Sequence, residues 1–153
     1  LNTTTSSYSL GFANPLSCAI GRAVLKEMVD QDLVANAASR GAQMKMQLLE
    51  MAKSNCVIGD VRGRGLLLAV ELVHDQETKQ QIPLETQAPA LFQKIAMDMG
   101  LATYCRRTSG GAYGDWLMIT PPLIVTEEQV NEIGTSLESA LNTFERTLSK
   151  AGH

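Results

Sequence analysis

Gly59-Asp60-Val61-Arg62-Gly63-Arg64-Gly65 is the most unusual stretch of the chain, and an apolar run over residues 66–70 follows it directly. Glycine reaches backbone conformations that other residues avoid, so this stretch predicts a tight turn that leads into a buried strand. Arginine carries a permanent charge and a planar fork of donors. The two arginines therefore favour either an anion site or ion pairs with nearby carboxylates such as Asp60 or Glu71.

The composition of the chain is that of a globular protein. It has 153 residues, of which 44% are apolar and 19% charged, enough for one domain with a buried core. The formal net charge is -3 and no basic stripe appears, so we expect no nucleic-acid partner. Because no apolar run approaches the roughly 20 residues of a membrane helix, we also expect no membrane partner.

Three cysteines, Cys18, Cys56 and Cys105, lie far apart and form no C-x-x-C pair. This spacing predicts neither a disulfide framework nor a metal site, and a reduced cytoplasmic protein is expected. We expect the three thiols to be small buried or half-buried side chains. The first residue is Leu1, so we expect the chain to begin inside a longer natural protein.

Apolar spacing and helix breakers predict the order helix, strand, helix, strand, strand, helix. A helical region is expected from about residue 15 to about 53, as either two helices or one bent helix, followed by a buried strand at residues 66–73. A helix from Thr86 that ends at Gly100 comes next, and then short strands at 101–105 and 116–120 with a glycine-rich turn at 106–114 between them. A terminal helix follows a capping box at Thr126-Glu127-Glu128-Gln129. We predict an α/β fold of two layers, in which helices cover a small, mostly antiparallel sheet.

Two polar clusters are candidate binding sites. Arg106 and Arg107 stand near Gly110 and Gly111, and adjacent guanidinium groups on a flexible turn suit a carboxylate or a phosphate. A solvated basic turn is the alternative. The hydroxyl-rich residues 3–9 precede a helix start and suit a phosphate, with a frayed terminus as the alternative.

Four motifs follow one another along the chain. They are Asn14-Pro15-Leu16-Ser17-Cys18-Ala19, then Asp32-Leu33-Val34-x-Asn36-Ala37, then residues 59–66, and then Gly114-Asp115 through Pro121-Pro122-Leu123-Ile124-Val125-Thr126. As a set, over residues 11–148, they resemble the C-terminal part of class III aminotransferases, which are pyridoxal-phosphate (PLP) enzymes of fold type I. The resemblance implies that residues 1–14 are a Ser/Thr-rich segment joined to an absent large domain, and that residues 15–153 are the C-terminal small domain.

The resemblance also implies an activity: a homodimer that uses PLP to transfer an amino group from an amine or ω-amino acid to a keto acid such as pyruvate. In the family, a lysine of the large domain holds the cofactor as a Schiff base. The six lysines of this chain lie at expected surface positions: Lys26, Lys45, Lys53, Lys79, Lys94 and Lys150. His74 in a polar loop and His153 at the end complete no catalytic triad. We expect no catalytic residue in this chain, which would be inactive alone.

Two departures from the family pattern bear on ligand binding. Family members carry a threonine before Asn-Pro-Leu that reaches the cofactor phosphate across the dimer interface. Here Gly11-Phe12-Ala13-Asn14 lacks it, which leaves Ser9 as the candidate cofactor-binding residue. Met118 stands where ornithine-type members place an arginine for the substrate carboxylate. The resemblance therefore points to the ω-amino acid:pyruvate branch, with Arg106 or Arg107 as a mobile arginine that swings in for a carboxylate and out for an apolar group.

Two other interpretations stay open from the sequence. In the first, the chain is a stand-alone domain that binds a small anion or a partner without catalysis. In the second, it is a truncated gene product with no independent role. A lysine-bearing large domain encoded upstream of Leu1 would separate the enzyme from both.

Overall fold

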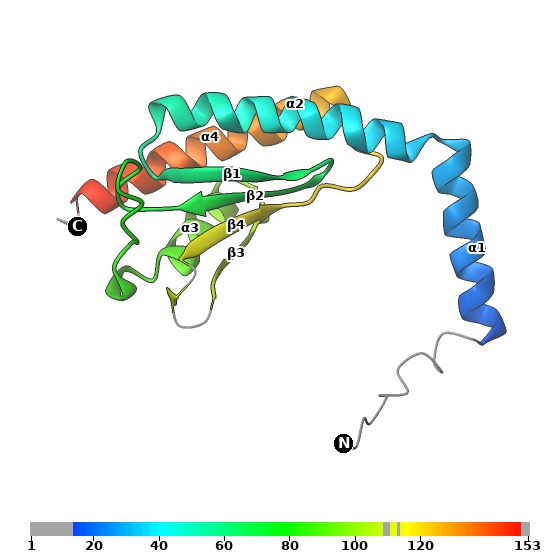
Figure 1. Cartoon of the computed structure of the whole chain (residues 1–153), viewed down its shortest axis with the longest axis horizontal. Helices are drawn as coiled ribbons and strands as arrows, with labels where there is room; N and C mark the ends of the chain where they lie inside the picture. The colour runs from blue at the N-terminus through cyan, green and yellow to red at the C-terminus, as the bar shows by residue number, and fades with distance from the viewer. Residues whose placement is uncertain (1–13, 109–110, 113, 151–153) are drawn as a thin grey trace, which may run out of the picture. The chain divides into compact units, whose positions relative to one another are not determined.

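The computed structural model describes residues 14–108, 111–112 and 114–150 (Figure 1). Contacts divide the chain into two compact units, Leu1–Val34 and Ala35–His153. Ser9 and the rest of the hydroxyl-rich segment lie outside the described residues. The domain boundary that the sequence places between residues 14 and 15 stays a prediction.

The described part of the first unit contains one complete helix, α1 (Pro15–Asp30). Asn14 caps the helix, because its Oδ1 accepts a hydrogen bond from the Ser17 backbone N–H at 2.8 Å. Pro15 follows as the first helical residue, where its missing N–H removes no helical hydrogen bond. The helical run stops before Asp32, whose φ of 47° is left-handed. Of the two alternatives for this region, two separate helices are therefore confirmed.

The second unit is built on a four-stranded antiparallel sheet with the strand order β1-β2-β4-β3. Its strands are β1 (Ile58–Arg64), β2 (Leu67–Leu72), β3 (Tyr104–Arg107) and β4 (Asp115–Ile119). Its helices are α2 (Leu33–Ser54), of which all but the first two residues belong to this unit, the short 3-10 helix η2 (Leu84–Thr86), α3 (Ala88–Asp98) and α4 (Glu127–Lys150). The predicted α/β class with a small antiparallel sheet is confirmed.

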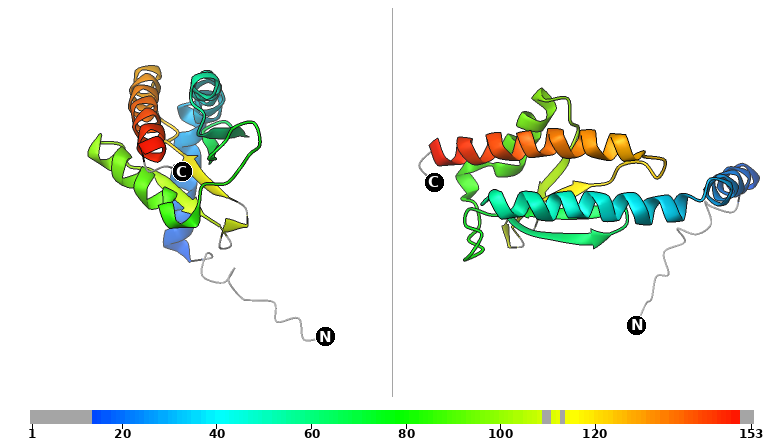
Figure 2. Two further views of the ribbon diagram at one scale, coloured as in Figure 1. Left: turned by 90° about the vertical axis from the view of Figure 1, so that its left-hand side faces the viewer. Right: turned by 90° about the horizontal axis from the view of Figure 1, so that it is seen from above.

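Helices α2, α3 and α4 pack on one face of the sheet and close the core. Side chains alternate between the two faces of a strand, and Val70 and Leu117, which pair across β2 and β4, both point into the core and are fully buried. The rings of Phe92 and Phe144 meet edge to face at 5.5 Å and join α3 to α4. Figure 2 shows α2 and α4 side by side over the sheet. This layer covers one face of the sheet.

Residues 59–64 belong to strand β1, so the turn predicted for this stretch is wrong. Strand β1 pairs with β2 as far as Arg64, which lies opposite Leu67, and only Gly65 and Leu66 form the turn. At Gly63 the φ is 125°, and a Cβ would lie 2.2 Å from the Leu67 carbonyl oxygen, so the hairpin requires glycine there. The glycines conceal the alternation of side chains by which a strand is recognised in a sequence.

The turn predicted at residues 106–114 begins later than expected. Arg106 and Arg107 are the last residues of β3, and they pair with Trp116 and Asp115 of β4. Leu101, which the sequence places in this strand, instead closes the end of α3 through its backbone N–H. Both arginines therefore lie on a strand within the sheet, and because they are adjacent they point to opposite faces.

The second face of the sheet, called the open face below, is covered by no helix of the described part of this unit (Figure 1). Strand register places its side chains in two rows, Arg62, Ala69, Met118, Tyr104 and Asp60, Glu71, Trp116, Arg106. Tyr104 remains 47% exposed and Leu67, at the β2 end, 60% exposed. The candidate arginine Arg106 thus belongs to an exposed surface of the sheet.

Candidate functional site

Arg62 makes the ion pairs that the sequence offered as one alternative for this region. Its Nε lies 2.8 Å from Asp60 Oδ2, and its Nη2 lies 2.9 Å from Glu71 Oε2. Its side chain is 64% exposed, so the pairs contribute little to stability but occupy the donors. Within the described part of the chain, Arg64 makes no ion pair. Of the two alternatives for the opening motif, Arg62 thus makes the ion pairs with Asp60 and Glu71.

Arg107 is held in a buried ion pair with Asp115, directly across from it on β4. The guanidinium donates to both carboxylate oxygens, from Nε to Oδ1 at 2.6 Å and from Nη2 to Oδ2. Nη2 also donates to the Ile82 carbonyl at 3.0 Å. The Asp115 side chain is 1% exposed and that of Arg107 15%. The hydrogen bonds to Asp115 raise the pKa of the Arg107 guanidinium, which stays charged. The Nε and Nη2 donors of Arg107 are therefore committed within the fold.

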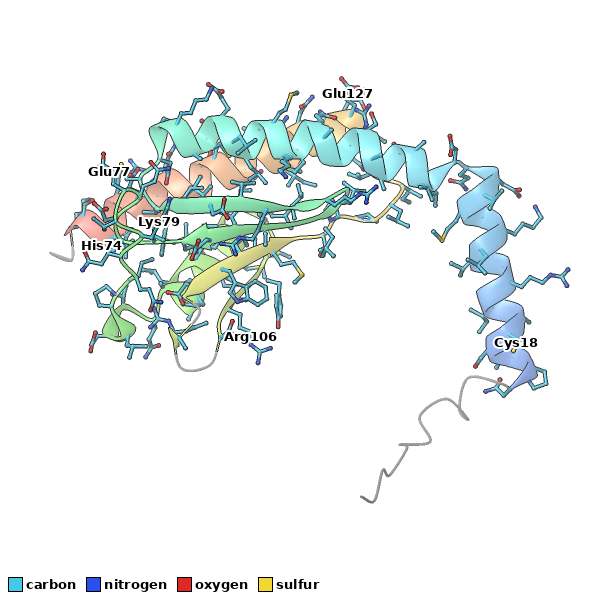
Figure 3. The ribbon with its side chains drawn as sticks, in the orientation of Figure 1. Cys18, His74, Glu77, Lys79, Arg106 and Glu127 are labelled. Carbon is cyan, nitrogen blue, oxygen red and sulfur yellow. The ribbon has the colours of Figure 1, made fainter. Side chains whose placement is uncertain are left out.

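Arg106 has a different environment, on the open face. Its side chain is exposed, and its Nη1 donates one hydrogen bond, to the neutral hydroxyl of Tyr104 at 3.1 Å. Figure 3 shows the labelled side chain pointing away from α2 and α4. A guanidinium with one neutral partner keeps donors for a ligand. Of the two sequence candidates, Arg107 is paired with a carboxylate, whereas Arg106 donates to a hydroxyl.

Tyr104 belongs to a small aromatic group that the sequence analysis missed. Its ring centroid lies 5.7 Å from that of Trp116, and Trp116 Nε1 donates to Thr108 Oγ1 at 2.5 Å. Tyr104, Arg106, Trp116 and Met118 share the open face of β3 and β4 and are called the open-face cluster below. The sequence signal for this group is a spacing of two residues, which places side chains on the same face of a strand. Tyr104 and Arg106 have this spacing in one segment, and Trp116 and Met118 have it in the other.

The open-face cluster borders a cleft of about 440 Å³. Tyr104 and Met118 line this cleft together with Pro121 and Pro122, and the lining is largely apolar. Thr103 contributes an Oγ1 that is buried without a hydrogen-bond partner among the described residues. Arg106 does not line this cleft, but it donates to the hydroxyl of Tyr104, which does. The two features together suit a ligand that carries both an apolar part and an anionic group.

Lysine is the residue type that holds PLP in the family that this sequence resembles. All six lysines fall within the described ranges, and none of them is buried. In general, burial is one way in which a protein makes a lysine able to hold PLP. The buried carboxylate of Asp115 is occupied by Arg107. Ser9, the cofactor-phosphate candidate, lies outside the described residues.

The remaining chemistry-bearing groups were predicted in part. Cys105 is buried as expected, but Cys18 and Cys56 are exposed because one lies on α1, which has no buried residue, and the other in the turn before β1. The described residues contain no group of three or more His, Cys, Asp or Glu side chains placed to hold a metal ion. Within the same ranges, no helix combines the length and the apolar character needed to cross a membrane.

Comparison with known proteins gives the family. Residues 5–141 match the family model described as aminotransferase class-III. An uncharacterized aminotransferase of Schizosaccharomyces pombe is 33% identical over 132 residues, which cover 86% of this chain and 29% of that protein. Alanine–glyoxylate aminotransferase 2 homolog 2 of Arabidopsis thaliana, a mitochondrial protein, is 32% identical over 84% of this chain and 26% of its own. The chain belongs to the class III aminotransferase family.

A solved structure supports the same assignment. The PLP-bound amine transaminase from an uncultivated Pseudomonas species shares 31% sequence identity and a TM-score of 0.72, over 83% of this chain and 27% of that one. The chain therefore spans less than a third of the length of these three relatives.

Proposed function

We propose that this chain is the C-terminal small domain of an enzyme that moves an amino group from an amine or ω-amino acid to a keto acid such as pyruvate, with PLP as cofactor. Membership of the class III family supports amino-group transfer, and the fold is shared with an amine transaminase in its PLP-bound form. When bound, PLP supplies the electron sink for the chemistry at the amino carbon. The residues of this chain act by binding and orienting the substrate.

The observation that carries the substrate assignment is the unequal state of the two adjacent arginines. Arg107 is engaged by a buried carboxylate, whereas Arg106 is exposed and donates to a neutral hydroxyl. A carboxylate binds a guanidinium through two parallel charge-assisted hydrogen bonds, which are about twice as strong as neutral ones. Arg106 is therefore the residue that binds the carboxylate of the keto acid, and Arg107 holds the strand that presents it.

Met118 explains how the same site would accept an amine without a carboxylate. It lies in the open-face row beside Tyr104 and lines the apolar cleft, where an arginine would leave a permanent charge. When Arg106 is swung away, the apolar lining of the cleft contacts the apolar part of the amine. When Arg106 is swung in, its guanidinium binds the carboxylate of the keto acid. The arrangement supports one pocket that serves both half-reactions.

The full-length protein tests the activity directly. Loaded with PLP and given an amine donor with pyruvate, it should form alanine, and omission of either substrate should abolish the product. Absence of alanine with every amine tested, together with binding of a small anion by the same protein, would favour the non-catalytic binding domain. The measurement is product formation followed by chromatography.

The location of the cofactor lysine has its own test. Borohydride reduction of the full-length holoenzyme should fix PLP to a lysine outside residues 1–153, because none of the six lysines here is buried. A labelled peptide that contains Lys45 or Lys79, read by mass spectrometry, would contradict this.

Ser9→Ala should weaken PLP retention, if Ser9 replaces the missing threonine as a phosphate ligand.

The homodimer and the cytoplasmic location also belong to this proposal. The family resemblance supports the dimer, and light scattering of the full-length protein measures it. Wide cysteine spacing, with two thiols exposed and one buried, supports a reducing compartment.

A further inference from the structure

Tyr104 and Arg106 are two residues apart on β3, so both side chains stand on the open face. The ring of Tyr104 packs at 5.7 Å from that of Trp116, which is itself anchored through Nε1 to Thr108 Oγ1 at 2.5 Å. The Tyr104 hydroxyl is thus fixed in place by its ring, and it accepts from Arg106 Nη1 at 3.1 Å. The contact holds a long, exposed side chain against the sheet.

We propose that the Tyr104 hydroxyl is the resting position of the Arg106 guanidinium and competes with the substrate carboxylate for it. This inference rests on the proposed role of Arg106 in binding the keto acid. In the resting position, Arg106 lies back on the open face and the apolar cleft is left to an uncharged donor. A carboxylate draws the guanidinium from the hydroxyl, and Tyr104 receives it again when the carboxylate leaves.

The strength of the two contacts fits a reversible exchange. A neutral hydrogen bond contributes only modestly in water, whereas a bidentate contact to a carboxylate is charge-assisted and stronger. The neighbouring Arg107 shows the stronger contact, because its guanidinium is charge-paired with the buried carboxylate of Asp115 and is held there. Glu71, in the same row as Arg106, is already engaged by Arg62 at 2.9 Å. Tyr104 is therefore a weak, neutral partner for Arg106, whereas a carboxylate in the same place would hold the guanidinium permanently.

Competition of this kind has a predictable sign. A ligand that binds only the released arginine has its affinity reduced by the fraction of molecules in which the arginine is free. Removing the hydroxyl should therefore tighten carboxylate binding by about two- to tenfold, the range of one neutral hydrogen bond. Tyr104→Phe removes the hydroxyl and keeps the ring that packs on Trp116, so folding should be unaffected.

The test uses the full-length holoenzyme and propionate, a carboxylate that cannot react, as a competitor of the keto acid. The variants are Tyr104→Phe, Arg106→Ala and the double variant, with Leu67→Ala as a control at another exposed position of the same face. Tyr104→Phe should lower the inhibition constant of propionate by about two- to tenfold. In the Arg106→Ala background the same substitution should leave this inhibition constant unchanged, and Leu67→Ala should leave it unchanged as well.

The outcomes separate this inference from the proposal on which it rests. If Arg106→Ala weakens propionate binding but Tyr104→Phe leaves it unchanged or also weakens it, Arg106 binds the carboxylate and the resting position at Tyr104 is wrong. If Arg106→Ala has no effect on propionate, the carboxylate role of Arg106 fails and the inference fails with it. A tightening by Tyr104→Phe that persists in the Arg106→Ala background also overturns the inference.

Discussion

Arg107 and Asp115 face each other across β3 and β4, with the Asp115 side chain 1% exposed and both of its carboxylate oxygens on the guanidinium. The pair lies at the end of the two strands that carry the open-face cluster. By fixing which residue of β3 lies opposite which residue of β4, it also fixes the position of Arg106 opposite Trp116 on the other face. A structural ion pair on one face thus sets the geometry of the candidate site on the other.

Breaking this pair should destabilise the second unit strongly. Asp115→Asn leaves the Arg107 charge partly buried without its counter-charge, and we expect a loss of about 3 kcal/mol in the free energy of unfolding. Urea unfolding followed by circular dichroism measures it. Arg62→Ala is the matched control, because its pairs are exposed, and it should cost less than about 1 kcal/mol. Equal losses in the two variants would contradict the buried pair.

The close approach of α2 to the β1–β2 turn gives a second prediction. A Cβ on Gly41 would lie 2.2 Å from the carbonyl carbon of Gly65, a backbone atom that cannot move aside alone. Gly41→Ala should therefore displace α2 from the hairpin and lower the free energy of unfolding by about 2 kcal/mol or more. Thermal unfolding of the variant measures the loss.

Gly21 provides the matched control on α1. A Cβ there meets no atom within 4 Å among the described residues, and the backbone is helical. Alanine favours a helix over glycine by about 1 kcal/mol, so Gly21→Ala should be neutral or stabilising. Equal losses of stability in the two alanine variants would contradict the contact with Gly65 as the cause of the Gly41→Ala effect.

The start of α4 tests the capping box predicted from sequence. Thr126 Oγ1 accepts from the Gln129 N–H at 3.3 Å, and Gln129 Oε1 accepts from the Thr126 N–H at 3.0 Å, which confirms the reciprocal pair. Thr126→Ala should lower the free energy of unfolding by about 1 kcal/mol, and Thr126→Ser should retain most of the stability that the cap contributes. Chemical unfolding distinguishes them. A serine variant as unstable as the alanine variant would argue against the hydroxyl as the cap.

Burial of Cys105 predicts slow thiol chemistry at alkaline pH. Burial raises the pKa of this thiol from 9.0 to about 12, and the charge of Asp115 adds to the shift. Because the folded pKa is raised, the protonated thiol stabilises the fold fully below pH 9.0, and this contribution is lost as the pH rises toward about 12. At pH 8.5, iodoacetamide should label exposed Cys56 at least about tenfold faster than Cys105, as mass spectrometry of peptides reports. Equal rates would contradict the burial.

The helices and the class of fold follow from sequence because their signals are local. Asn14 before Pro15 and Thr126 before Gln129 satisfy backbone groups within one turn, and the structure places a cap at each. Strand β1 escaped prediction because Gly63 and its neighbouring glycines have no side chains to alternate, and only pairing with β2 makes the segment a strand.

The candidate site was predictable in residue type but not in arrangement. Two adjacent arginines indicate an anion site, yet their different roles depend on which face each one occupies. Asp115 is eight residues from Arg107 with a turn between, and only the cross-strand register brings it there. Tyr104 was overlooked because its importance comes from contacts with Arg106 and Trp116 rather than from a motif.

The carboxylate role of Arg106 is the central claim, and the two half-reactions of the full-length holoenzyme test it most directly. For Arg106→Ala, the rate constant of the keto-acid half-reaction should fall by about tenfold or more, the value of one or two charge-assisted hydrogen bonds. The half-reaction with an amine that lacks a carboxylate should change by less than about twofold, and exposed Arg64→Ala should leave both unchanged. An equal loss in the two half-reactions of Arg106→Ala, or no loss in either, would contradict the account.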